Sequence, residues 1–135
     1  MKIKTILTVG CLIALYGCSS EDHVAQTEQE AKVFTQTLQN YAQKNMTSSM
    51  NKEEGCKMME KASSEALHSV NSSFSAMNEW VEGYKDPIMA LTSNTIPAQI
   101  FIAIGAGLGD CGSFLADDEA KKLVNTVNVT NKSHK

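Results

Sequence analysis

The chain has 135 residues, of which 42% are hydrophobic and 20% are charged, so it can form one small domain but not a multidomain enzyme. Its formal net charge of −3 excludes the basic field that nucleic-acid binding requires, and no nucleic-acid partner is expected. Two prolines are too few for a proline-rich linker protein.

Residues 1–17 have the organisation of a secretory signal peptide. Lys2 and Lys4 form a basic region, and an apolar run of about twelve residues follows it. This run is too short to span a membrane, which takes roughly 20 apolar residues. We therefore expect residues 1–17 to direct export and to be removed. The remaining 118 residues hold ten lysines and fifteen acids, a formal charge of −5.

The end of the apolar run resembles the lipobox of bacterial lipoproteins. It reads Leu15-Tyr16-Gly17-Cys18. The resemblance implies that Cys18 is acylated, becomes the N-terminus after cleavage and carries a lipid anchor. Two serines follow Cys18 where many Gram-negative lipoproteins have an Asp that retains them in the inner membrane. The resemblance therefore favours the outer membrane, facing the periplasm. A Gram-positive host would change this to the outer face of the plasma membrane, and an ordinary secretory signal would leave Cys18 a free thiol.

The four cysteines fall into different classes. Cys11 leaves with the signal peptide and Cys18 carries the lipid, so Cys56 and Cys111 remain in the domain. In an oxidising envelope, two remaining cysteines most economically form one disulfide. Closing a loop of about 55 residues stabilises a domain by roughly 4 kcal/mol. We expect a structural disulfide, because the pair lacks the CxxC spacing of redox sites.

Hydrophobic periodicity predicts helices after a lipidated tether at residues 18–26. Thr27 followed by Glu30 is typical of a helix start, and the same signal recurs at Asn51 with Glu54. The second helix keeps its period almost to Gly83. A helix of that length exceeds the width of a domain this small, so we expect a bend near residues 70–73 or a protruding end.

The rest of the helical domain, which we expect to span residues 27–127, holds three further predicted elements. They cover residues 87–91, 98–108 and 115–127. The segment 98–108 is apolar on every side and could be a helix or a strand, but no other strand is predicted to pair with it, which favours a helix. Residues 128–135 are expected to be a disordered tail. The prediction is an all-α fold, a small four- or five-helix bundle with one disulfide.

Motifs of catalytic or metal sites are weak in this chain. The segment from Gly105 to Gly109 lacks the strand and the spacing of a phosphate-binding loop. We interpret its small residues as ones that let helices pack closely or that end a helix before Cys111. Glu65 and His68 form only half of a di-metal motif, and the other two histidines lie in the predicted tether and tail. Methionines could bind copper, but most lie at core positions of the helices. We expect no catalytic residue, no metal site and no cofactor.

One face of the long second helix is rich in small polar residues and poor in charge. Such a face costs little to desolvate and to order when a protein partner binds. The alternative is that these residues face water or pack on a neighbouring helix. The predicted binding stripe consists of Ser64, His68, Asn71, Ser75, Asn78 and Glu82, with Trp80 and Tyr84 at its end.

These features favour a lipid-anchored, non-catalytic protein-binding module of the cell envelope. The membrane is contacted through the lipid on Cys18, and the protein partner is an envelope component or an incoming protein. In layout the chain resembles the helical pilotin lipoproteins of type II secretion and the periplasmic immunity proteins of type VI secretion. The alternative is a carrier of a small ligand or of copper in the periplasm.

Overall fold

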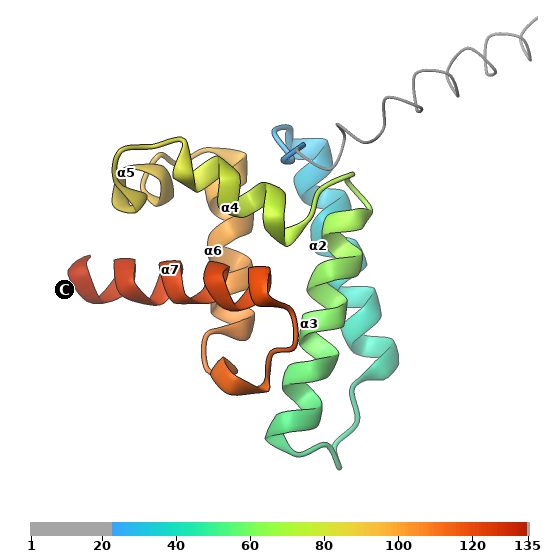
Figure 1. Ribbon diagram of the computed structural model, residues 1–135. Helices are drawn as coiled ribbons and strands as arrows, with labels where there is room; N and C mark the ends of the chain where they lie inside the picture. The colour runs from blue at the N-terminus through green and yellow to red at the C-terminus, as the bar shows by residue number, and fades with distance from the viewer. Residues whose placement is uncertain (1–22, 135) are drawn as a thin grey trace, which may run out of the picture.

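The computed structural model describes residues 23–134, and every regular element in that range is helical (Figure 1). Six α-helices and one 3-10 helix lie there, and no strand does, which confirms the all-α prediction and the helix over residues 98–108. The number of helices exceeds the predicted four or five. The predicted signal peptide and the predicted lipidation site, Cys18, lie outside the described residues. The elements are α2 (Glu28–Asn45), α3 (Lys52–His68), α4 (Phe74–Glu82), α5 (Pro87–Leu91), α6 (Ile96–Leu108), η2 (Gly112–Phe114) and α7 (Asp118–His134).

The first two helices begin where the sequence predicts. Thr27 Oγ1 accepts the backbone N–H of Glu30 at 3.0 Å, and the Glu30 carboxylate accepts the backbone N–H of Thr27. Asn51 and Glu54 make the same reciprocal pair at the start of α3, at 2.8 and 3.0 Å. Each reciprocal pair, known as a capping box, satisfies backbone N–H groups at the helix start that have no partner within the helix.

The predicted long second helix is divided into two helices, α3 and α4, which agrees with the bend expected near residues 70–73. Asn71 has a φ of 59°, which is left-handed backbone that ends a helix. Ser73 then caps α4, because its Oγ accepts the backbone N–H of Ala76 at 3.0 Å. The chain therefore turns after α3, and α4 leaves in a new direction (Figure 1).

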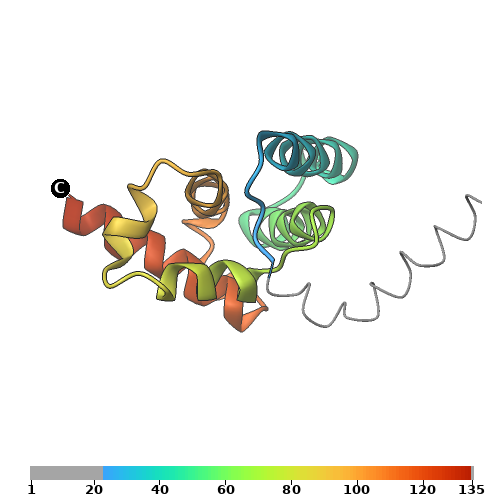
Figure 2. The same ribbon diagram turned by 90° about the horizontal axis from the view of Figure 1, so that it is seen from above.

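The helices pack as two groups. α2 and α3 lie side by side as an antiparallel hairpin, and α4 to α7 form the second group, in which α7 crosses α6 and packs against α4 (Figures 1 and 2). Because α6 and α7 cross, the helices do not share one bundle axis. The core between the groups includes the fully buried side chains of Phe34, Leu67, Met77, Phe101, Ile104, Leu108 and Leu123.

The crossing of α6 and α7 depends on Gly105. A Cβ atom at this position would lie 2.7 Å from a methyl carbon of Val127, closer than two carbon atoms can pack. Gly105 therefore serves close helix packing, as predicted, and Gly109 is the C-cap of α6, which is the other predicted role. No helix between residues 23 and 134, α6 included, is both long enough and apolar enough to span a bilayer.

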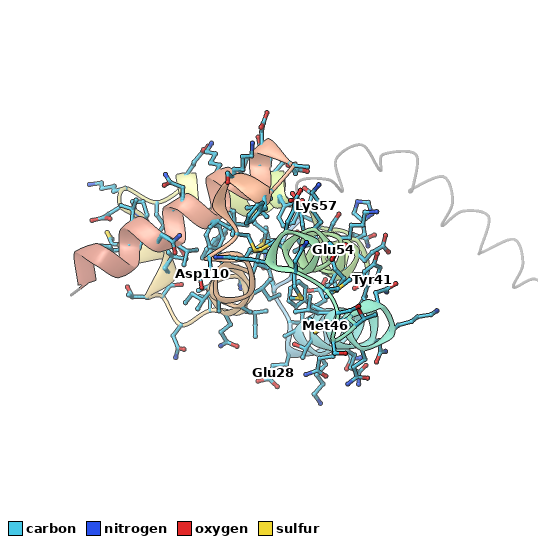
Figure 3. The ribbon with its side chains drawn as sticks, turned by 90° about the horizontal axis from the view of Figure 1, so that it is seen from below. Glu28, Tyr41, Met46, Glu54, Lys57 and Asp110 are labelled. Atoms are coloured by element: carbon cyan, nitrogen blue, oxygen red, sulfur yellow. A yellow bond between two sulfur atoms is a disulfide. The ribbon has the colours of Figure 1, made fainter. Side chains whose placement is uncertain are left out.

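The predicted disulfide is present. Cys56 of α3 bonds to Cys111, which lies between α6 and η2, and their Cα atoms are 5.6 Å apart. Both residues are buried, and Figure 3 shows the sulfur–sulfur bond between α3 and the end of α6. The bridge therefore ties the hairpin to the second group.

A buried carboxylate makes a second tie between the two groups. Glu60 of α3 is 8% exposed and accepts the backbone N–H groups of Ala116 and Asp117, at 3.0 and 2.8 Å. Asp117 in turn accepts the N–H of Glu119 at 2.7 Å at the start of α7. Glu60 thus fixes where α7 begins.

The C-terminal prediction was wrong. The last helix was expected over residues 115–127, followed by a disordered tail at 128–135, whereas α7 runs from Asp118 to His134. Thr130 is buried, and its hydroxyl donates to the carbonyl of Thr126 at 2.8 Å. The helix continues because Val127 and Thr130, three residues apart, keep one buried face.

Candidate binding site

The predicted binding stripe is divided by the break between α3 and α4. Ser64 and His68 belong to α3, Asn71 lies in the connecting turn, and Ser75, Asn78 and Glu82 belong to α4. The residues were expected to share one helix face, and that geometry is wrong. α3 ends at His68, Asn71 has left-handed backbone in the turn, and Ser73 caps the start of α4.

Two residues of the stripe are used to join α4 to α7. Asn78 is only 3% exposed, and its amide donates to the backbone carbonyl of Glu119 at 2.8 Å and to its carboxylate at 2.9 Å. Glu82 pairs with Lys122, which raises the pKa of the lysine through the hydrogen bond to the carboxylate and its charge. The alternative interpretation, packing on a neighbouring helix, holds for Asn78, whereas Glu82 stays exposed and pairs with Lys122 at the surface.

The remaining residues of the stripe fall into two places. His68, Asn71 and Ser75 are exposed around the turn between α3 and α4, and Ser64 is half-buried beside them. The half-buried Trp80 and Tyr84 contact each other edge to face, with ring centroids 5.4 Å apart, and Trp80 packs on Phe101 of α6. A role of either group in partner binding stays a prediction.

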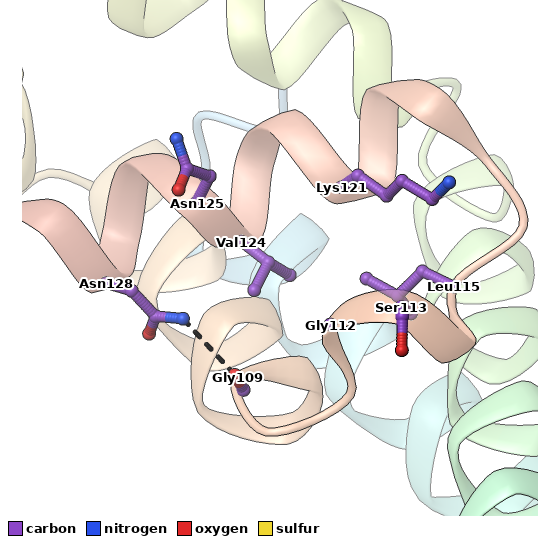
Figure 4. Close-up of a pocket in the computed structure, with 8 residues that line it drawn as sticks. All are labelled: Gly109, Gly112, Ser113, Leu115, Lys121, Val124, Asn125 and Asn128. Carbon is purple, nitrogen blue, oxygen red and sulfur yellow. Dashed lines mark hydrogen bonds between the residues drawn. The ribbon is translucent and has the colours of Figure 1, made fainter.

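A surface cavity that the sequence analysis did not predict lies between the end of α6, η2 and α7 (Figure 4). We call it the α6–α7 cavity. Its volume is about 320 Å³, at the lower end of the range of ligand sites. The lining residues are Gly109, Gly112, Ser113, Leu115, Lys121, Val124, Asn125 and Asn128.

Two local features shape the α6–α7 cavity. Gly109 ends α6, and its carbonyl accepts the Asn128 side-chain amide at 3.2 Å, which holds α7 against this turn. Gly112 has a φ of 39°, and a Cβ atom there would meet nothing within 4 Å, so its missing side chain leaves open space. The four α7 residues of the lining are spaced by three and four along the helix and share one face. That spacing was the sequence signal that could have found them.

The α6–α7 cavity combines an apolar floor with hydrogen-bonding groups at its rim. Leu115 and Val124 are buried, whereas Ser113, Lys121 and Asn125 are exposed. Figure 4 shows the two side chains of the floor between α7 and η2. No carboxylate is among the lining residues, although Asp118 lies 3.9 Å from the Lys121 ammonium. The cavity therefore suits an apolar group carried on a segment that offers hydrogen-bond acceptors.

The titratable groups elsewhere form no further cluster of ligands. Among the described side chains of residues 23–130, no three His, Cys, Asp or Glu are grouped so that they could hold a metal ion. His68 is exposed, and His23 pairs with Glu30 at 2.8 Å. Met58 and Met77 are buried in the core, where they fill space between the helices.

Comparison of the chain with protein-family models, with curated proteins and with solved structures finds no match.

Proposed function

We propose that the protein is a lipid-anchored, non-catalytic protein-binding module of the bacterial cell envelope. The lipid on Cys18 holds it at the outer membrane, facing the periplasm. The N-terminal lipobox supports the anchor, and the small disulfide-bonded domain is of a kind suited to an oxidising compartment.

The observation that carries the binding role is the α6–α7 cavity. It lies at the surface and pairs the buried Leu115 and Val124 with the exposed donors of Lys121 and Asn125. Protein interfaces concentrate their binding energy where an apolar side chain of one partner fills such a pocket and polar groups surround it. An apolar side chain of the partner would occupy the floor, and its backbone carbonyls would accept from the rim.

Two kinds of partner fit this proposal. An incoming toxin would make the protein an immunity or inhibitor protein, and a secretion component would make it an assembly factor. The resemblance in layout applies equally to immunity proteins and to secretion assembly factors, so it does not distinguish the two partners. A toxin gene beside this gene would favour the first partner, and a secretin operon would favour the second.

Affinity capture from envelope extracts with the lipidated full chain tests the binding role. Lys121→Glu reverses the charge at the rim of the cavity, and Asn125→Lys places a long side chain there. Both residues are exposed, so folding should be unaffected. We expect both variants to lose the captured protein, whereas Lys32→Glu, an exposed change on α2, should retain it. Equal capture by all three variants would refute the assignment of the cavity.

A small-ligand carrier is the second candidate function. The volume of the α6–α7 cavity, about 320 Å³, would hold a small molecule, and this observation favours it. Native mass spectrometry of protein purified from the periplasm would detect a bound molecule, and titration with copper(I) would test the methionines. A stoichiometric ligand that Asn125→Lys displaces would replace the protein-binding proposal with the carrier.

A further inference from the structure

The N-terminal segment directly before α2 is part of the folded domain. Val24 and Ala25 are buried, 6% and 1% exposed, and belong to the hydrophobic core. Glu30 holds the segment from the other side, because its carboxylate accepts the backbone N–H of Gln26 at 2.8 Å and pairs with the His23 ring at 2.8 Å. The chain is therefore fixed to the domain from His23 onward.

The position of His23 limits how far the domain can lie from its anchor. Five residue steps separate Cys18 from His23, and an extended chain spans at most about 3.5 Å for each, or about 17 Å in total. This reach is shorter than the width of a domain of this size, which is about 30 Å. With a lipid on Cys18, only the end of the domain that carries residues 23–26 can lie against the bilayer.

That end of the domain carries aromatic side chains. Gln26 lines a surface cavity of about 280 Å³ together with Trp80 of α4 and Ile96 of α6. Tyr84 contacts Trp80 edge to face, and Met89 of the neighbouring α5 is 54% exposed. We call the surface of Gln26, Trp80, Tyr84 and Ile96 the aromatic end.

The opposite end of the domain is formed by other elements. Figure 1 shows the N-terminal segment beside α4 and the start of α6, with the turn between α2 and α3 and the turn at η2 at the far end. Figure 3, which looks onto that far end, labels Met46, Glu54 and Asp110 there.

We propose that the aromatic end docks on the headgroup layer of the bilayer that holds the Cys18 lipid. The inference rests on the lipid anchor of the proposed function. Trp and Tyr favour this layer because each has an apolar ring and a polar hydrogen-bonding group. Lys85 and Asp86, which follow Tyr84, give one charge of each sign, so zwitterionic lipid is the expected surface. Docking in this way turns η2 and the rim of the α6–α7 cavity away from the bilayer.

Trp80 is the single tryptophan of the chain, so its fluorescence reports on this end alone. The lipidated full chain is reconstituted in vesicles of phosphatidylcholine and phosphatidylethanolamine that contain a spin-labelled headgroup. Binding is checked by flotation. We expect the headgroup label to reduce Trp80 emission at least about twofold, because a docked Trp80 lies at headgroup depth. Quenching by aqueous iodide should fall relative to a Cys18→Ser chain, which has no sulfur to acylate and stays in solution.

A matched reporter at the other end completes the experiment. Phe114 of η2 is half-buried at the far end, so Phe114→Trp combined with Trp80→Phe moves the probe there. We expect little headgroup quenching from this variant. Vesicle-bound protein whose Trp80 is not quenched overturns the docking and leaves the anchor intact, and it indicates that Trp80 faces a protein or the solvent. A chain that does not float with the vesicles overturns the lipid anchor and the docking with it.

Discussion

The substitution Glu60→Gln tests how the buried carboxylate holds the start of α7. Glu60 accepts the N–H of Ala116 with both oxygens, at 3.0 and 3.1 Å, and the N–H of Asp117 at 2.8 Å. Oε2 accepts both N–H groups, so a glutamine oxygen in its place could keep them. The glutamine is uncharged, however, and its amide nitrogen would take the position of Oε1, where it is a donor facing the Ala116 N–H. Hydrogen bonds to charged groups are worth about 1.5–3 kcal/mol, so we expect the free energy of unfolding to fall by about 2 kcal/mol.

Urea unfolding of the oxidised protein, followed by far-UV circular dichroism, measures this change. For a slope of about 2 kcal/mol per molar urea, the midpoint should fall by about 1 M. Glu65→Gln is the matched control, because Glu65 is exposed on the same helix, and it should change stability by less than about 0.5 kcal/mol. If the two variants unfold at the same urea concentration, the carboxylate does not fix α7 and the reasoning fails.

Three further predictions concern stability. Replacing Cys56 and Cys111 together by serine should lower the free energy of unfolding by roughly 4 kcal/mol, as measured in urea, because the bridge closes a separation of 55 residues. Gly105→Ala should cost about 1–3 kcal/mol through its clash with Val127, and adding Val127→Ala should recover part of that loss if the clash is the cause. The backbone hydrogen bond from Gln26 and the contact with His23 lower the pKa of Glu30 below 4.5. The contribution of ionised Glu30 to the free energy of unfolding is therefore complete above the unfolded-state pKa and is lost as the pH falls through the lower, folded-state pKa. The stability difference between the wild type and Glu30→Gln should therefore shrink as the pH is lowered, which unfolding curves at several acidic pH values would measure.

The local signals of the sequence were sufficient for the starts of the first two helices, whereas the break after α3 was expected only from helix length, as one of two alternatives. Capping at Thr27 and Asn51 involves residues three positions apart, and such short-range geometry is independent of the rest of the fold. The end of α7 was missed for the opposite reason. All residues of 128–134 except Val129 are polar, and the segment shows little helical signal alone. The buried face shared by Val127 and Thr130 exists only once α7 packs on the other helices.

The predicted stripe shows what periodicity cannot decide. Asn78 and Glu82 have the spacing of an exposed helix face, yet Asn78 is buried against Glu119 and Glu82 pairs with Lys122. Their partners lie about 40 residues away, and only the turn of α4 toward α7 brings them together. The same contacts join α4 to α7. They bury the Asn78 side chain, whereas Glu82 stays exposed while paired with Lys122.

The sequence by itself determined the all-α class and the pairing of Cys56 with Cys111. Helical periodicity depends on residues that are close together in the chain, and the cysteines left for the domain can be counted. Only the tertiary structure decided which surfaces are available. The α6–α7 cavity and the aromatic end are each assembled from segments far apart in the chain, so their residues carry no shared signal until the two helix groups pack.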